Sequence, residues 1–308
     1  MSKKIPKQVK LVKESYIKQS RKNIHISYSQ LNTYLNCPRL WELQYLRKIA
    51  PFDPSIHMTF GSAFHETLQN YLDVMYNDSV KAANDIDIDT YLYDQMIKNY
   101  RRTRAQNGHE HYTTADQLNL FYLDGKHILD YIKKNRGTYF QSQRKGVHLA
   151  GIETLLYQEL SPGIFFKGLI DLVFWDERDD TYTLVDIKTS TKGWNKWAKE
   201  DDKKTAQLLL YKEFFSKQFN VDVDKVKIAY FIVKRQVPVE ADFASMQKRV
   251  QEFIPASGKL KRGKAISYMN KFIEDTLDED GKFLDKKYKC TNQKPCFFCS
   301  KIYNGILD

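Results

Sequence analysis

The sequence predicts an α/β fold, in which a central mixed β-sheet is flanked by helices and follows a mostly helical N-terminal part. Two observations predict it. Apolar residues recur at helical spacing through the first half of the chain. From Val147 the pattern changes to short apolar runs, which are separated by turns rich in Gly, Pro and Asp. A helical segment lies before the last of these runs.

The first half carries the amphipathic pattern of several helices, with good N-cap residues such as Ser27 ahead of one of them. A proline disfavours helical backbone in the residue before it, so Pro38 marks the end of that helix. We expect helices from Ser27 to near Pro38, over 40–46, from Gly61 onward, and over about 91–106 and 116–135.

The second half supplies the sheet. Its apolar runs have the length and composition of buried strands, and the last one is apolar on both faces. We expect strands at 147–159, 164–175, 181–188 and 226–233, a helix at about 203–218, and a Gly- and Lys-rich loop at 255–264.

Composition narrows the class of protein. The 308 residues are enough for a sizeable core, and the formal net charge of +11 indicates an acidic partner, of which nucleic acid is the commonest. A merely soluble basic protein is an equally weighted alternative. No apolar run approaches the roughly 20 residues of a transmembrane helix, and the start lacks the apolar stretch of a signal peptide, so we expect a cytoplasmic protein.

Charged residues interrupt three consecutive strands that are otherwise apolar. Glu153 and Asp171 lie within the first and second runs, and Asp186 and Lys188 end the third. Since alternate residues of a strand share a face, Asp186 and Lys188 point the same way. A buried carboxylate is costly unless it is paired, protonated or bound to a cation. A Mg²⁺ or Mn²⁺ site explains all three acids; a Lys–Asp ion pair with edge carboxylates is the alternative.

The helix at 203–218 adds two polar residues to this set. Gln207 and Tyr211 stand four residues apart and therefore share a helix face. Taken alone, they also fit an ordinary amphipathic helix with an interfacial tyrosine.

In this order the residues resemble the signature of the RecB/AddB/Cas4-like exonuclease branch of the PD-(D/E)XK nuclease superfamily. That signature contains a helical His, a central Asp, a second acid with a Lys two residues on, and a QxxxY helix. The matching segments are Gly61–Glu66 with His65, Gly168–Asp171, Asp186–Thr189 and Gln207–Tyr211, and the opening at 27–39 also resembles the family. The resemblance runs from about 26 to 233. The second acid is often Glu in the family and is Asp186 here; both occur.

The resemblance implies the superfamily's nuclease fold and a role for each residue. The groups implied as ligands of Mg²⁺ or Mn²⁺ are His65, Asp171, Asp186 and the carbonyl of Ile187. Glu153 is implied to hold a metal-bound water or a second ion. Lys188 is implied to position the attacking water or to stabilise charge that develops on the phosphate. Gln207 and Tyr211 are implied to orient Lys188 and to touch the DNA backbone.

Four cysteines are distributed as in relatives that carry an iron–sulfur cluster, with one early and three late. They are Cys37, Cys290, Cys296 and Cys299. The late cysteines read C-x5-C-x2-C, whereas those relatives have C-x2-C-x5-C. Three interpretations stay open: a 4Fe-4S cluster, which the resemblance favours, a zinc site with the same ligands, or thiols without a metal.

We expect three parts in the chain, of which the basic first part follows from its many Lys and Arg residues, and the resemblance implies a function. The parts are a flexible basic arm at 1–23, a nuclease domain at 24–289 with a helical part at 24–145 and a catalytic core at 146–240, and a cysteine-bearing tail at 290–308. The implied activity is metal-dependent hydrolysis of DNA with a free or single-stranded end, in repair, recombination or genome processing. A helicase or recombination protein is a candidate partner. The alternatives are a non-catalytic DNA-binding or scaffolding subunit and a Cas4-type nuclease that works with integrase partners.

Further basic and aromatic residues are candidates for contact with DNA. Basic clusters attract phosphates, although each cluster alone is more often a solvated face. Tryptophans can stack on unpaired bases, and core packing is an equally weighted alternative for them. The candidates are the basic arm, Arg101–Arg104, Lys133–Arg136, Lys259–Arg262, Trp194 and Trp197.

Overall fold

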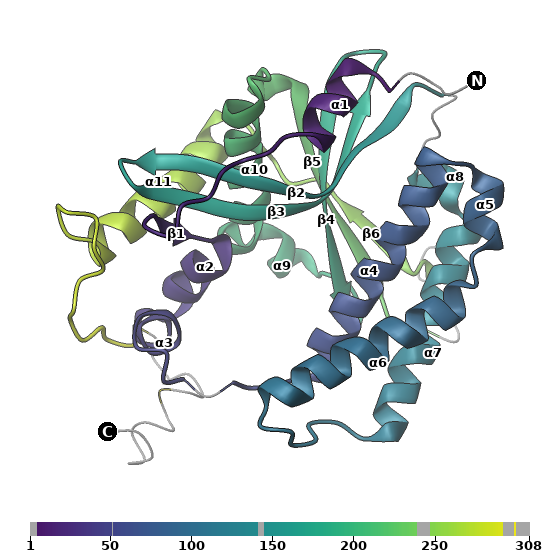
Figure 1. Cartoon of the computed structure of the whole chain (residues 1–308), viewed down its shortest axis with the longest axis horizontal. Coiled ribbons are helices and arrows are strands. Elements are labelled where there is room, and N and C mark those ends of the chain that lie inside the picture. The colour runs from purple at the N-terminus through teal and green to yellow at the C-terminus, as the bar shows by residue number, and fades with distance from the viewer. Residues whose placement is uncertain (1–4, 51, 141–144, 239–246, 292–298, 300–308) are drawn as a thin grey trace.

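The computed structural model describes residues 5–50, 52–140, 145–238, 247–291 and 299. A six-stranded mixed sheet lies at the centre, and helices cover both of its faces (Figure 1). This confirms the predicted fold class, including the helical N-terminal part. None of the helices in the described ranges combines the length and the hydropathy needed to cross a membrane.

The sheet has the order β1-β3-β4-β5-β6, with β2 paired to β3. The β2–β3, β3–β4 and β5–β6 pairs are antiparallel, whereas β1–β3 and β4–β5 are parallel. A parallel pair needs a crossover, and for β4–β5 the helix α10 is part of it. The strands are β1 (Ile24–Ile26), β2 (Val147–Ser161), β3 (Ile164–Asp176), β4 (Thr181–Ser190), β5 (Val226–Lys234) and β6 (Val250–Phe253).

Two hydrophobic clusters make up the core. The first joins the sheet to helices of the N-terminal segment and the C-terminal half, and the second joins it to the long helices of the first half. Helices of the first cluster are α1 (Lys7–Lys13), α2 (Tyr28–Asn36), α3 (Pro38–Trp41), α10 (Asp202–Phe219) and α11 (Lys259–Thr276). Those of the second are α4 (Ile56–Asn77), α5 (Val80–Asp85), α6 (Ile88–Gln106) and α7 (Ala115–Lys134). The described residues also include the short elements η1 (Glu42–Leu46), α8 (Arg136–Tyr139), α9 (Lys196–Glu200) and η3 (Val223–Lys225).

The four predicted strands are β2 to β5, and the helices predicted at 91–106, 116–135 and 203–218 are α6, α7 and α10. Strands β1 and β6 were not predicted, because three or four residues are too short to show an alternation. The predicted loop at 255–264 is wrong from Lys259 onward, where α11 begins directly after Gly258.

The N-terminal segment, for which the sequence indicated a flexible basic arm, contains the packed helix α1. Val9 and Val12 lie one turn apart on this helix and are buried against the first core cluster. Two valines among many lysines give too weak an apolar pattern to reveal this contact in the sequence.

Candidate active site

The site forms where β3 and β4 separate. Their pairing ends at Leu172 and Val185, beyond which β4 continues with β5 as its partner, while β3 pairs with β1 near its start. This divergence leaves room for a side chain beside β4. Asp171 occupies it, and its Oδ2 accepts a hydrogen bond from the Ile187 N–H at 2.6 Å. The carboxylate thereby replaces the neighbouring strand as a partner for that backbone amide.

His65 reaches the same point from α4. Phe64 and Leu68 are buried on this helix and fix its position over the sheet. The His65 Nδ1 lies 3.6 Å from Asp171 Oδ2. Burial, followed by the charge of Lys188, lowers the pKa of His65 to about 4, against the opposing effect of a hydrogen bond to the Ile187 backbone. The imidazole is therefore neutral at neutral pH and keeps a lone pair for a cation.

Asp186 and Lys188 share a face of β4, as their alternation predicted, and Lys188 contacts Gln207 of α10 from this face. Asp186 is 2% exposed, and its Oδ2 lies 2.8 Å from the Lys188 Nζ. The same ammonium donates to Gln207 Oε1 at 3.0 Å, and Gln207 Nε2 donates to the Tyr211 hydroxyl at 3.3 Å. The chain of contacts runs from the carboxylate to the helix and fixes the direction of the lysine.

The charges around this point are not balanced within the protein. Burial, followed by the charge of Asp186, raises the pKa of Asp171 well above its usual range, although the Ile187 amide and Lys188 oppose the shift. Burial also raises the pKa of Asp186 against the attraction of Lys188. Asp186 Oδ2 is buried and, within the described residues, has no partner in hydrogen-bond geometry despite its ion pair. A bound cation would favour the charged form of both carboxyls, and it would give Asp186 Oδ2 a partner.

The donor set suits a hard divalent ion. The imidazole of His65, the carboxylates of Asp171 and Asp186 and the backbone of Ile187 lie near one another at the divergence of β3 and β4. The ligand atoms of the three side chains do not all lie within 4.8 Å of one another. In the described ranges, only a group of three cysteines has its ligand atoms that close together. Instead, Lys188 and the Ile187 amide engage the aspartate oxygens. The residues fit Mg²⁺ or Mn²⁺ in chemistry and charge, and His65, Asp171 and Asp186 would hold the ion.

Glu153 is exposed on β2, between Ile152 and Thr154, whose partners in β3 are Leu172 and Ile170 on either side of Asp171. Its backbone has a φ of 48°, a left-handed conformation that is unusual for this residue type. Gln69 Nε2 donates to Glu153 Oε1 at 2.6 Å and to the carbonyl of Asp171 at 3.3 Å. Sequence analysis missed Gln69, although it follows His65 by four residues and so shares its helix face.

The candidate DNA contacts differ in exposure. Trp194 packs against Tyr230 with ring centroids 4.8 Å apart, so core packing is the right explanation for this residue. Trp197 is 77% exposed and is available to a base. Lys261 and Arg262 form ion pairs with Asp202 and Glu213.

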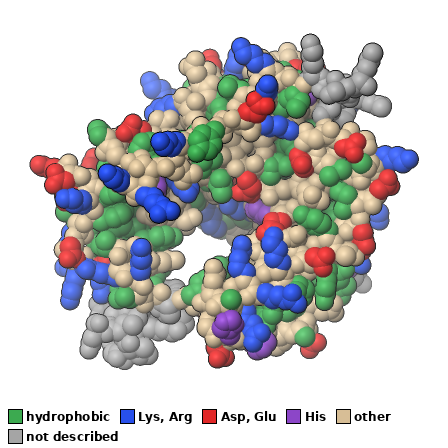
Figure 2. Space-filling model, viewed as in Figure 1, with side chains coloured by type: hydrophobic (Ala, Val, Ile, Leu, Met, Phe, Trp, Pro, Cys, Tyr) green, Lys and Arg blue, Asp and Glu red, His purple; other side chains and the backbone are tan. Residues whose placement is uncertain are grey.

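Figure 2 shows a deep hollow in one face of the molecule, between α2 and α3 on one side and α4 and α6 on the other. Lys and Arg side chains are visible at its rim and in its depth. The sheet borders the hollow, so a strand of nucleic acid would meet a basic surface there.

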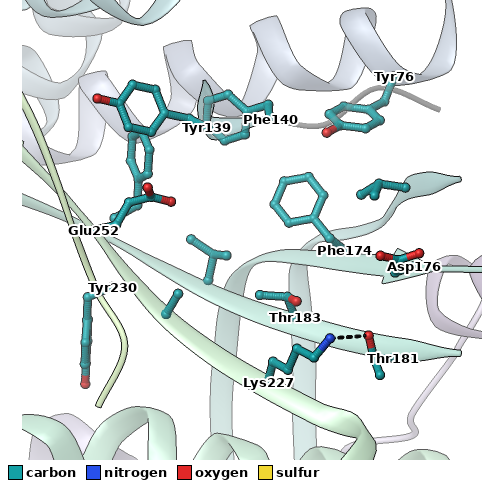
Figure 3. A pocket seen from close by; sticks show the side chains of 14 residues that line it. Tyr76, Tyr139, Phe140, Phe174, Asp176, Thr181, Thr183, Lys227, Tyr230 and Glu252 are labelled. Carbon is teal, nitrogen blue, oxygen red and sulfur yellow. Dashed lines mark hydrogen bonds between the residues drawn. The ribbon is translucent and has the colours of Figure 1, made fainter. Parts of the chain in front are cut away.

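A separate cavity of about 190 Å³ lies at the other end of the β3–β4 hairpin (Figure 3). Aromatic rings such as Phe140 and Phe174 line it, and Lys227 donates to Thr181 Oγ1 at 3.0 Å at its floor. None of the predicted site residues lines this cavity, so it is not part of the candidate active site.

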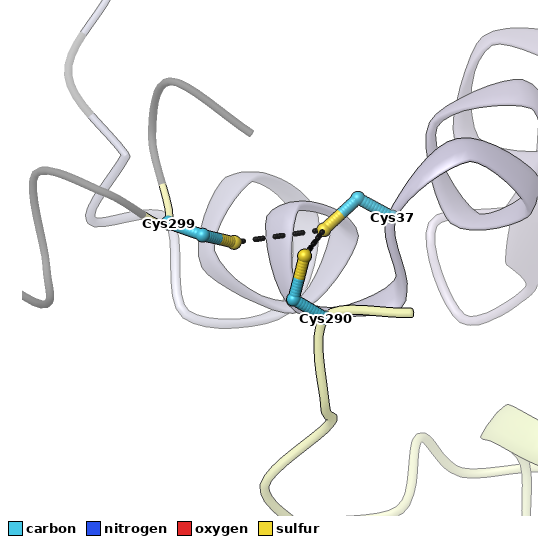
Figure 4. Close-up of side chains that lie close together, drawn as sticks. All are labelled: Cys37, Cys290 and Cys299. Atoms are coloured by element: carbon cyan, nitrogen blue, oxygen red, sulfur yellow. Dashed lines mark hydrogen bonds between the residues drawn. The ribbon is translucent and has the colours of Figure 1, made fainter. Parts of the chain in front are cut away.

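The cysteines form a second cluster. Cys37, Cys290 and Cys299 bring their Sγ atoms within 4.8 Å of one another (Figure 4). Cys296 lies outside the described residues. Three thiolates are ligands for zinc and for iron–sulfur clusters alike.

Comparison with known proteins agrees with this geometry. A family model described as the PD-(D/E)XK nuclease superfamily matches residues 25–300. No curated protein matches the chain. The matched range includes every residue of the candidate active site.

Proposed function

Because the chain belongs to the PD-(D/E)XK nuclease superfamily, we propose that it is a metal-dependent deoxyribonuclease that degrades DNA from a free or single-stranded end. The observation that carries the proposal is the meeting of His65, Asp171, Asp186 and Lys188 around the Ile187 backbone. A structural ion pair accounts for the contact between Lys188 and Asp186. It does not account for the burial of a second carboxyl, Asp171, whose pKa is raised.

A divalent ion bound at this point supplies activation of water and neutralisation of charge on the scissile phosphate. The protein supplies position. Lys188 is held between Asp186 and Gln207, so its ammonium is set to stabilise negative charge that develops on the phosphate. Tyr211 fixes Gln207 from the next turn of α10.

Glu153 and Gln69 form the outer wall of the site. Glu153 accepts the Gln69 amide at 2.6 Å, which aims its carboxylate from β2 toward the Asp171 side of the site. In this position Glu153 would orient a water molecule or would help to hold a second ion.

The preference for an end is proposed from the hollow of Figure 2, because Lys and Arg side chains at its rim suit the backbone of a single strand that enters it. Trp197, 77% exposed, offers a stacking surface for an unpaired base. We place the activity in DNA repair, recombination or genome processing, with a helicase or recombination protein as the partner.

The test is incubation of the purified protein with end-labelled linear single- and double-stranded DNA, and with covalently closed circles. Mg²⁺, Mn²⁺ and chelator are the three conditions. Release of short products from linear DNA with either metal, and none with chelator or circles, supports the proposal. Cleavage of circles would contradict the exonuclease assignment. Binding without cleavage under any metal would identify a DNA-binding subunit.

A further inference from the structure

We propose that Cys37, Cys290 and Cys299 bind a single Zn²⁺ ion that fastens the C-terminal segment to the junction of α2 and α3. The Cys37 Sγ lies 3.5 Å from the Sγ of Cys290 and 3.6 Å from that of Cys299. Figure 4 shows the three thiols converging from separate segments of the chain. The site is independent of the proposed nuclease activity.

The sulfur spacing distinguishes one ion from a cluster. Zinc–sulfur bonds of about 2.3 Å in a tetrahedron place neighbouring sulfurs about 3.8 Å apart. The two printed separations are close to this value, and the third lies within the same 4.8 Å limit. In a 4Fe-4S cluster each thiolate binds a different iron, so its sulfurs are spread more widely. The spacing therefore favours zinc over the cluster that the resemblance implies.

Contacts of the surrounding chain hold two of the thiols in place. Cys37 caps α3, and its Sγ accepts the Leu40 N–H at 3.4 Å. Near Cys290, the Tyr288 N–H donates to Glu42 Oε2 at 2.8 Å, and Glu42 is 1% exposed. Because these contacts involve neither sulfur–sulfur attraction nor Cys299, the proximity of Cys37 and Cys290 follows from the fold itself. The protein presents a preformed pair of ligands.

An ion here would join segments that lie far apart in the chain. Cys37 is 253 residues from Cys290 and 262 from Cys299. Closing so long a loop with a metal restricts the unfolded chain strongly, and binding to the folded site adds directly to folding stability. Two of the thiols are buried, so the protein would shield the ion on that side, and the three thiolates leave a fourth position for a further ligand.

Elemental analysis of the full-length protein, purified without chelator, tests the proposal. We expect one zinc per chain, little iron, no acid-labile sulfide and no visible absorption. X-ray absorption at the zinc edge should show sulfur neighbours at about 2.3 Å. This measurement needs no variant and stands even where a substitution prevents folding. Iron with labile sulfide, or a protein without metal, would overturn the proposal.

Variants provide the second arm. Cys37→Ser and Cys290→Ser should each lose zinc and unfold at lower temperature, while Lys188→Met should keep a full complement of zinc. Retention of zinc by both serine variants would contradict the assignment. Because the readout is metal content, absence of DNA cleavage by the unaltered protein would leave this result unaffected.

Discussion

Asp171 Oδ2 accepts the Ile187 amide at 2.6 Å, at the point where β3 stops pairing with β4. The hydrogen bond joins β3 to β4 and places the Asp171 carboxylate near Asp186. Burial, followed by the charge of Asp186, raises the pKa of Asp171 there. This relation connects the topology of the sheet to the proposed chemistry, because the carboxylate reaches the site through the divergence of the two strands.

Asp171→Asn should lower the rate of cleavage on the order of a thousandfold, which corresponds to a loss of several kcal/mol of transition-state stabilisation. Because the folded-state pKa of Asp171 is raised, its contribution to stability is lost as pH rises through that pKa. At neutral pH the neutral amide should therefore unfold at a higher temperature than the metal-free wild type. Calorimetry with and without Mg²⁺ checks this. A variant less stable than the metal-free protein would argue against charge crowding at the site.

Lys188→Met should lower the cleavage rate by about 10²- to 10³-fold, since it removes the ammonium that would stabilise charge on the phosphate. The fold should persist because the side chain is about one-third exposed, at 34%. Lys282→Ala is the matched control, since that lysine is 76% exposed. The measurement is the cleavage rate of each variant at saturating metal. Equal rates for the two variants would show that Lys188 has no role in cleavage.

Gln69→Met should weaken the apparent affinity for the metal by about 10- to 100-fold, because groups that orient metal ligands typically contribute this much. The variant removes the 2.6 Å hydrogen bond to Glu153 and the 3.3 Å hydrogen bond to the Asp171 carbonyl. Titration of the rate with Mg²⁺ should show a higher half-saturating concentration. Gln158→Met, on the exposed part of β2, is the control. An unchanged titration would mean that Glu153 needs no such support.

Local contacts within the candidate site could be predicted from the sequence, whereas the assembly of the site could not. Alternation in β4 placed Asp186 and Lys188 on one face, and helical spacing placed Gln207 beside Tyr211. In the structure Lys188 contacts Asp186 and Gln207, and Gln207 contacts Tyr211. These relations are local, so residue spacing determines them.

Long-range relations were not predictable in the same way. The contact between Gln69 and Glu153 joins residues 84 apart in the chain. The divergence of β3 and β4 depends on strand pairing, which the sequence of either strand alone does not determine. The cysteines show the same limit. Their order along the chain indicated a shared site, but only the Sγ separations distinguish one ion from a cluster.

Cleavage should decline as pH falls through the raised pKa values of Asp171 and Asp186, because a protonated carboxyl no longer attracts a cation. Protons and metal compete for the same oxygens, so tenfold more Mg²⁺ should move this acidic limb to lower pH. His65 should contribute no limb between pH 5 and 8, since its pKa of about 4 keeps it neutral there. The check is kcat/KM against pH at two Mg²⁺ concentrations. A limb near pH 6.5 that is indifferent to metal would instead indicate an ordinary histidine and would remove the physical basis for treating His65 as a metal ligand.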